Sequence, residues 1–429
     1  MFDLAIINGK VFNGKDFIEA NIYIKDEKIE VISKDTFKAH EVLDAFSGLV
    51  LPALIDPHVH FNLDLGRIRS CDDFYYGTLQ AAYGGITTII DFLDPVDHPD
   101  ALEVAYNKRL NEARNSVIDY SFHATIKNPQ CDLEAFVLKM KDLNINSLKL
   151  FTTYSESNRQ TKDEDIIELL KLSKKYNFLL LAHIENDIMI DLSPQLKYCH
   201  ILSSRPSLAE TKEALKLASF VEKTGGNLYM VHLSSGVTLE KLKATYPEII
   251  NRNFFIESCP HYFVFTNDFL EREDGYLYTL APPLRTRKER SLLKTLFDDV
   301  YSIGTDHCAF MVKEKQKKYL NEIPLGIGGI EFSFDVMYNL FQEETINKMS
   351  KNIASLYPNL KGRGQIKEGF FANIFVYELF DNFIDKFHGF SDYSVYLNLI
   401  RKGKVKHTIN RGQFVIKDYE FVKPVAKKV

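Results

Sequence analysis

The pattern of hydrophobic and polar residues changes twice along the chain. Within the first 50 residues, segments 4–8, 20–25 and 28–33 partly alternate apolar and polar positions, which is typical of short strands. From residue 49 onward, brief apolar runs are separated by longer segments with helical spacing, such as 102–114 and 164–175. After about residue 365 the strand pattern returns, at 372–377 and 405–416.

The middle part has the pattern of a parallel sheet with crossover helices. Eight apolar runs occur there, at 50–60, 87–92, 120–125, 147–151, 178–184, 228–233, 254–258 and 300–305. Eight such units predict an α/β fold in which residues 52–365 form a (β/α)8 TIM barrel. We expect the strand-rich ends, 1–51 and 366–429, to form one small composite β-sandwich domain.

Composition narrows the function classes. The chain has 429 residues, of which 45% are hydrophobic and 26% charged, and its net charge is −5. The basic residues are dispersed, so we expect no nucleic-acid partner, and the one basic stretch, 313–318, is predicted to be a solvated loop or helix face. No apolar run approaches the ~18 residues of a membrane span, so we expect no membrane partner.

The cysteines and the N-terminus bear on location. The five cysteines are scattered and show no CxxC spacing, which argues against a disulfide framework and against a thiolate zinc site. The first residues, Met1-Phe2-Asp3-Leu4, lack a positively charged region, so we expect no secretory signal. Both features predict a cytoplasmic protein.

Histidines at predicted strand ends are the main chemical signal. His58 and His60 close the first run and, being two residues apart on a strand, point to the same side. His183 and His232 fall in the fifth and sixth runs, and Asp306 follows the eighth. Barrel enzymes keep their active sites at the C-terminal ends of the strands, so four histidines and a carboxylate meeting there predict a metal site.

Lys149, in the fourth run, joins this group as an unusual member. An ammonium group has no lone pair to offer a metal ion. A desolvated lysine can lose its proton, and the free amine could then add carbon dioxide. The resulting carbamate would have two oxygens able to bridge two ions, so carbamylation of Lys149 is a hypothesis that the residues permit.

An ordered series of motifs resembles the cyclic amidohydrolases, within them the hydantoinase and dihydropyrimidinase group. The matching segments span nearly the whole predicted barrel. They include Asp56-Pro-His-Val-His60, Ser147-Leu-Lys-Leu-Phe151, Ala182-His-Ile-Glu185, Val231-His-Leu-Ser-Ser235, Glu257-Ser-Cys-Pro-His-Tyr262, Pro282-Pro-Leu-Arg285, Thr305-Asp-His-Cys308, Gly328-Gly-Ile-Glu331 and Lys361-Gly-Arg-Gly-Gln-Ile-Lys-Glu-Gly369.

The resemblance implies a binuclear metal centre that hydrolyses a cyclic amide with a metal-bridging hydroxide. Its ligands would be His58, His60, carbamylated Lys149, His183, His232 and Asp306. Zinc suits such ligands, as do manganese, cobalt and iron. Asp306 would carry the proton to the leaving nitrogen, and Tyr154 would stabilise the oxyanion. From their positions in the sequence, we expect His261 and His307 to pack beside the site, where either could orient Asp306. The resemblance also implies a homo-oligomer, a dimer or a tetramer.

Departures from the family pattern leave the substrate open. Dihydroorotases carry an arginine two positions after the second histidine, and here that position is Asn62, although Arg67 or Arg69 could replace it. Asn62 is closer to allantoinases, whereas Tyr154 favours hydantoinases. Ala281 and Leu325 stand at substrate-binding positions where hydantoinases have serine and asparagine.

We therefore expect a hydrolase acting on a small cyclic amide, a hydantoin or a dihydropyrimidine. Dihydroorotase and allantoinase are the alternatives of the same class. A non-catalytic scaffold related to dihydropyrimidinase is the alternative from another class. Scaffold relatives lack the metal ligands, which this chain retains.

Overall fold

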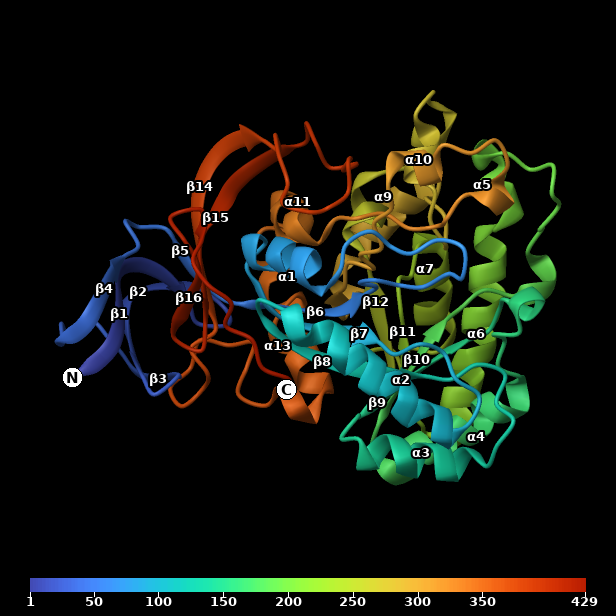
Figure 1. Ribbon diagram of the computed structural model, residues 1–429, viewed down its shortest axis with the longest axis horizontal. Helices are drawn as coiled ribbons and strands as arrows, with labels where there is room; N and C mark the ends of the chain where they lie inside the picture. Colours follow the sequence, from blue (N-terminus) through green and yellow to red (C-terminus); the bar gives the residue numbers. More distant parts are fainter.

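Two sheets organise the molecule in the computed structural model, which describes residues 1–429 (Figure 1). One is a nine-stranded sheet with the order β17-β16-β15-β14-β5-β1-β2-β3, in which β4 also pairs with β1. The other is an eight-stranded parallel sheet that runs in chain order from β6 to β13. This confirms the predicted TIM barrel with a sandwich-like β domain beside it.

The nine-stranded sheet is built from both ends of the chain. Strand β5 pairs in parallel with β1 and antiparallel with β14, with Val50 opposite Val376. Leu4, Ile22 and Ile374 lie in the buried cluster that fills this region. Its strands are β1 (Phe2–Phe12), β2 (Phe17–Lys25), β3 (Lys28–Ser33), β4 (Ala39–Asp44), β5 (Leu49–Pro52), β14 (Ile374–Phe383), β15 (Ile400–Asn410), β16 (Gln413–Lys417) and β17 (Glu420–Phe421).

Every predicted run of the barrel contains a strand. The barrel closes where Val59 forms a bridge with His307, whose carbonyl accepts the His60 N–H at 2.9 Å. The strands are β6 (Leu54–Val59), β7 (Ile86–Phe92), β8 (Asp119–Thr125), β9 (Ser147–Phe151), β10 (Leu179–His183), β11 (Leu228–Met230), β12 (Phe254–Ser258) and β13 (Ser302–Ile303).

Helices surround the barrel and cover its apolar outer face (Figure 1). None of them is both long and apolar enough to cross a membrane. They are α1 (Phe74–Tyr83), α2 (Pro99–Glu112), α3 (Leu133–Asp142), α4 (Asp163–Tyr176), α5 (Ile201–Ser204), α6 (Ser207–Thr224), α7 (Gly236–Thr245), α8 (Pro260–Val264), α9 (Arg287–Thr295), α10 (Val312–Lys315), α11 (Ser333–Phe341), α12 (Glu344–Lys348) and α13 (Lys351–Leu356).

The first predicted run, 50–60, divides between the two sheets. Its start belongs to β5 and its end to β6, with the break at Ala53. The Ala53 N–H bonds to the carbonyl of Asn373, beside β14, whereas the Leu54 N–H bonds to that of Gly85, beside β7. An apolar run does not reveal such a change of partner, because both sheets bury these residues.

Candidate metal centre

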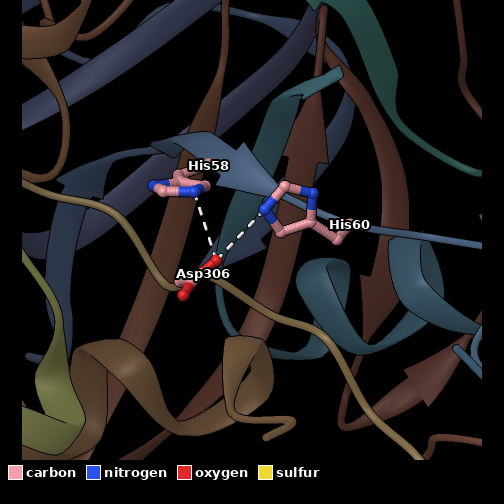
Figure 2. A group of neighbouring side chains, drawn as sticks. All are labelled: His58, His60 and Asp306. Atoms are coloured by element: carbon pink, nitrogen blue, oxygen red, sulfur yellow. Dashed lines mark ion pairs between the residues drawn. The ribbon is translucent and has the colours of Figure 1, made fainter. Parts of the chain in front are cut away.

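His58, His60 and Asp306 form the tightest group of potential ligands. One ligand atom from each lies within 4.8 Å of the others. Oδ1 of Asp306 lies 3.1 Å from Nε2 of His58 and 3.2 Å from Nε2 of His60 (Figure 2). His58 lies near the end of β6 and His60 directly follows it, while Asp306 follows β13, so barrel closure brings the three residues together.

The other predicted ligands line the same cavity. The His183 and His232 rings lie 4.6 Å apart, and His232 is 5.4 Å from His58. Lys149 and Tyr154 also line this cavity, whose volume is about 230 Å³. The structure thus gathers all six residues proposed as ligands at one end of the barrel. A volume below the ~300–1,000 Å³ typical of drug-sized pockets suits a small ring.

Lys149 is a buried cation without an anionic partner. It is 3% exposed, and its Nζ makes neither a hydrogen bond nor an ion pair. The nearest aromatic rings, Phe92 and Phe151, have centroids 5.3 and 5.7 Å from it. Burial lowers the pKa of Lys149 to about 8, so a part of the molecules holds the neutral amine near neutral pH. The neutral amine is the form that can add carbon dioxide.

Two buried glutamates orient the histidines. Oε1 of Glu257 lies 2.8 Å from Nδ1 of His58 and accepts the His232 backbone N–H at 3.1 Å. Oε2 of Glu185 lies 2.7 Å from Nε2 of His183 and also pairs with Arg205. A carboxylate on one ring nitrogen fixes the tautomer and directs the other nitrogen to a metal ion. Neither glutamate has a role that was predicted from the sequence, although His183-Ile-Glu185 lies within one motif.

The protonation of the histidines fits a cation site. Burial lowers the pKa of His60 to about 4, and it also lowers the pKa values of His183 and His232. Neutral imidazole is the form that binds a metal ion. Burial would also lower the pKa of His58, but the charges of Glu257 and Asp306 outweigh it and raise it to about 9. Nε2 of His58 is buried, makes no hydrogen bond and lies 3.1 Å from Oδ1 of Asp306, so this donor set fits a metal centre.

Several site residues have left-handed backbone conformations. The φ angles are 72° at Tyr154, 43° at His232 and 50° at Asp306. Such conformations cost of order 1–3 kcal/mol for residues other than glycine and cluster at functional sites. Strain at three residues around one cavity is a signal that the sequence pattern does not contain.

A buried lysine organises the proposed substrate-binding segments. Nζ of Lys315 donates to the carbonyls of Thr279 at 2.7 Å, Gly326 at 2.8 Å and Pro324 at 3.2 Å. These bonds tie together the two segments that place Ala281 and Leu325 on the cavity wall. Lys315 is 0% exposed, so the prediction of a solvated stretch at 313–318 is wrong at this position. Lys315 can be buried because three backbone carbonyls accept hydrogen bonds from its ammonium group, and composition does not show these acceptors.

Other predicted residues lie beside the cavity. Asn62 is not among its lining residues, although Leu63, Asp64 and Leu65 are. The His307 ring bonds to Asp72 at 2.9 Å and to backbone N–H groups beyond residue 328, so it does not orient Asp306. His261 is buried, and its ring nitrogens make no hydrogen bond. The substrate role of Asn62 stays a prediction.

A model of the amidohydrolase family matches residues 49–415. The chain is 30% identical to a D-hydantoinase from Geobacillus stearothermophilus, over 97% of this chain and 93% of that protein. The chain therefore belongs to the amidohydrolase family, and this membership implies dependence on divalent metal ions.

Solved structures agree with this assignment. The chain is similar to a dihydropyrimidinase from Brevibacillus agri with a TM-score of 0.93 and 26% identity, over 100% of this chain and 98% of that one. A D-hydantoinase (dihydropyrimidinase) from a Thermus species matches with a TM-score of 0.91 and 27% identity, over 99% of this chain and 98% of that one.

Proposed function

We propose that this protein is a metal-dependent hydrolase that opens the cyclic amide of a hydantoin or dihydropyrimidine ring. Its metal centre would comprise two divalent ions, with zinc as the favoured metal, held by His58, His60, His183, His232, Asp306 and a carbamylated Lys149. The buried, unpaired ammonium of Lys149 among these residues carries the proposal, because a cation there opposes metal binding and a carbamate assists it.

The protein side chains have distinct parts in this reaction. Bound divalent ions supply Lewis acidity and lower the pKa of the attacking water. Asp306, close to both His58 and His60, accepts the proton of that water and delivers it to the leaving nitrogen. Burial raises the pKa of Tyr154 to about 12, so its hydroxyl stays protonated and can donate a hydrogen bond to the developing oxyanion.

The positions of Arg67 and Arg69 favour hydantoins over dihydroorotate. Arg69 pairs with Asp64 at 2.6 Å, and neither Arg69 nor Arg67 lines the cavity. Neither arginine therefore substitutes for the one that Asn62 replaces. The scaffold alternative is disfavoured because all six residues proposed as ligands line one cavity.

Three further properties are part of the proposal. The division into a composite domain, 1–51 with 366–429, and a barrel domain, 52–365, is supported by the two sheets. A homo-oligomer is supported by apolar side chains exposed on β14 and β15, among them Leu379, Phe383 and Ile400. Cytoplasmic location is supported by the absence of disulfides between the five cysteines.

A hydrolysis panel tests the proposed function. Dihydrouracil, hydantoin, allantoin and dihydroorotate would each be incubated with protein whose metal content is measured on the same sample. We expect ring opening of hydantoin or dihydrouracil by metal-loaded protein, with slower turnover of allantoin and dihydroorotate. Full activity in a metal-free preparation would overturn the proposed mechanism.

A further inference from the structure

Arg159 gives the cavity wall a charge that no other residue balances. The cavity is lined by four charged side chains besides the histidines, namely Lys149, Asp306, Asp64 and Arg159. The first two belong to the metal centre. Asp64 is paired with Arg69 at 2.6 Å and also accepts the Gly66 backbone N–H at 2.8 Å. Arg159 is half-buried, and its guanidinium makes no hydrogen bond or ion pair.

The backbone holds Arg159 beside the reaction centre. Its N–H donates to the carbonyl of Tyr154 at 3.0 Å, which closes a tight turn through η2 (Ser155–Ser157). The next residues fasten the turn, because the Gln160 side chain donates to the Thr152 carbonyl at 3.0 Å and the Thr161 N–H to that of Phe151 at 2.8 Å. The Tyr154 ring lies 5.1 Å from His183. Arg159 thus projects from the same turn as the proposed oxyanion donor.

The neighbouring arginine has a different environment. Arg205 stacks over the Tyr154 ring, with its guanidinium carbon 5.1 Å from the centroid, and is neutralised by Glu185. The Arg205 guanidinium is therefore already paired within the protein, whereas the N–H donors of the Arg159 guanidinium are free to bind a substrate. A guanidinium offers a planar fork of N–H groups that matches a carboxylate in two parallel hydrogen bonds.

We infer that Arg159 selects substrates whose ring carries a carboxylate-bearing substituent. This inference rests on the proposed function, since it concerns the substituent of the ring that the metal centre opens. The apolar residues Leu63, Leu65 and Phe151 on the same wall suit the short carbon chain between the ring and the carboxylate. The guanidinium then binds the charged end.

A matched substrate pair measures this selection. The hydantoin of a carboxyethyl side chain and its carbamoylethyl counterpart have nearly the same shape and differ in charge. For the metal-loaded wild-type protein we expect kcat/KM to be at least about 10-fold higher for the carboxylate, which corresponds to about 1.4 kcal/mol. Arg159→Gln should remove most of this ratio, mainly through KM for the carboxylate, and Arg159→Lys should retain a part of it.

The matched control is Arg67→Gln, which removes an exposed arginine that does not line the cavity, and its carboxylate preference should equal that of the wild type. Because Arg159 is partly exposed, the preference should fall as salt is added. In dihydroorotate the carboxylate is attached to the ring itself and not to a side chain. We expect kcat/KM to be higher for the carboxyethyl hydantoin than for dihydroorotate.

The outcomes separate the two proposals. A protein that opens unsubstituted hydantoin but treats the carboxylate and the amide alike overturns the role of Arg159 and leaves the proposed function intact. An Arg159→Gln variant that keeps the full preference for the carboxylate also overturns it. A metal-loaded protein that opens none of these rings contradicts the proposed function itself.

Discussion

The two ends of the barrel differ in whether a buried charged side chain is paired with an opposite charge. Asp119, at the start of β8, is 0% exposed and fully partnered. It pairs with Arg363 at 3.0 Å and with Arg411, and it accepts the Lys427 backbone N–H at 2.8 Å. Lys149, on the neighbouring strand β9, is nearly as buried but has no partner of opposite charge.

This difference distinguishes a structural end from a functional one. A buried charge costs several kcal/mol unless it is paired and hydrogen-bonded. The residues that neutralise Asp119 come from the last 70 residues of the chain, so the returning C-terminal segment completes that end of the barrel. At the other end lie the residues proposed as metal ligands, among them Lys149, whose Nζ forms no ion pair.

Removing Lys149 should have the largest effect on activity. We expect Lys149→Ala to lower kcat/KM for hydantoin by at least about 1,000-fold, a barrier difference of about 4 kcal/mol, because the variant would lose the carbamate proposed to help hold the metal ions. In chelator-treated protein the same variant should be no less stable than the wild type, since it removes an unpaired charge. Lys171→Ala, on the surface of α4, is the control, and ring opening at the wild-type rate by Lys149→Ala would refute the carbamate hypothesis.

Removing Asp119 should give the opposite result. Asp119→Asn leaves Arg363 without a counter-charge and leaves Arg411 with only Glu27, 3.6 Å from its Nε. Loss of one partner of a buried pair costs about 3–5 kcal/mol. Denaturant unfolding measures this loss. Asp163→Asn, which breaks an exposed pair with Lys216, should cost less than about 1 kcal/mol. If Asp119→Asn instead abolished turnover in the folded protein without destabilising it, the contrast between the two ends would be wrong.

Weakening the support of His58 should have an intermediate effect. Glu257→Gln keeps the shape of the side chain but removes the charge that holds Nδ1 of His58. Loss of such an orienting carboxylate typically lowers metal affinity 10–100-fold, which we expect here in a competition titration against a chelator. Glu248→Gln, at an exposed position, should bind metal like the wild type. Equal metal affinity in both variants would show that Glu257 does not support metal binding by His58.

Lys315 offers a third kind of buried charge, one with neutral partners only, and its effect should depend on pH. Burial lowers the pKa of Lys315 to about 7, whereas an unfolded lysine titrates near 10.4. Between these values the unfolded state binds more protons, so stability contributed by this residue rises with pH. We expect the unfolding free energy of the wild type, relative to Lys315→Met, to increase by about 2 kcal/mol from pH 7 to 9.

A pH-independent difference would show that Lys315 does not titrate in this range. Such a result would place Lys315 with Asp119 as a fully compensated charge.

Much of the fold could be predicted because strands buried on both faces are continuous apolar runs. All eight barrel strands overlap the predicted runs, and only Ile86 of β7 and Asp119 of β8 fall outside them. Strand β4 was not predicted, because residues 40–42 are exposed and form no apolar run. Its strand conformation comes from pairing with β1.

The ligand positions could be predicted from their places at strand ends, but the groups that support them could not. Glu257 lies inside a predicted strand, and its partner His58 is 199 positions away in the chain, so the sequence does not indicate their contact. In the sequence, Arg159 and Lys315 look like surface residues. Only the fold shows that Arg159 lines the cavity and that Lys315 bonds to three backbone carbonyls. Such roles depend on contacts between segments far apart in the chain.

The dependence of ring opening on bound metal ions decides whether this cavity is the proposed metal centre. The purified protein would be analysed for divalent ions and assayed on hydantoin and dihydrouracil, then stripped with a chelator and reloaded. We predict about two ions per chain, loss of ring opening on stripping and recovery on reloading with zinc or manganese in the presence of bicarbonate. Undiminished ring opening by the stripped protein would contradict the account.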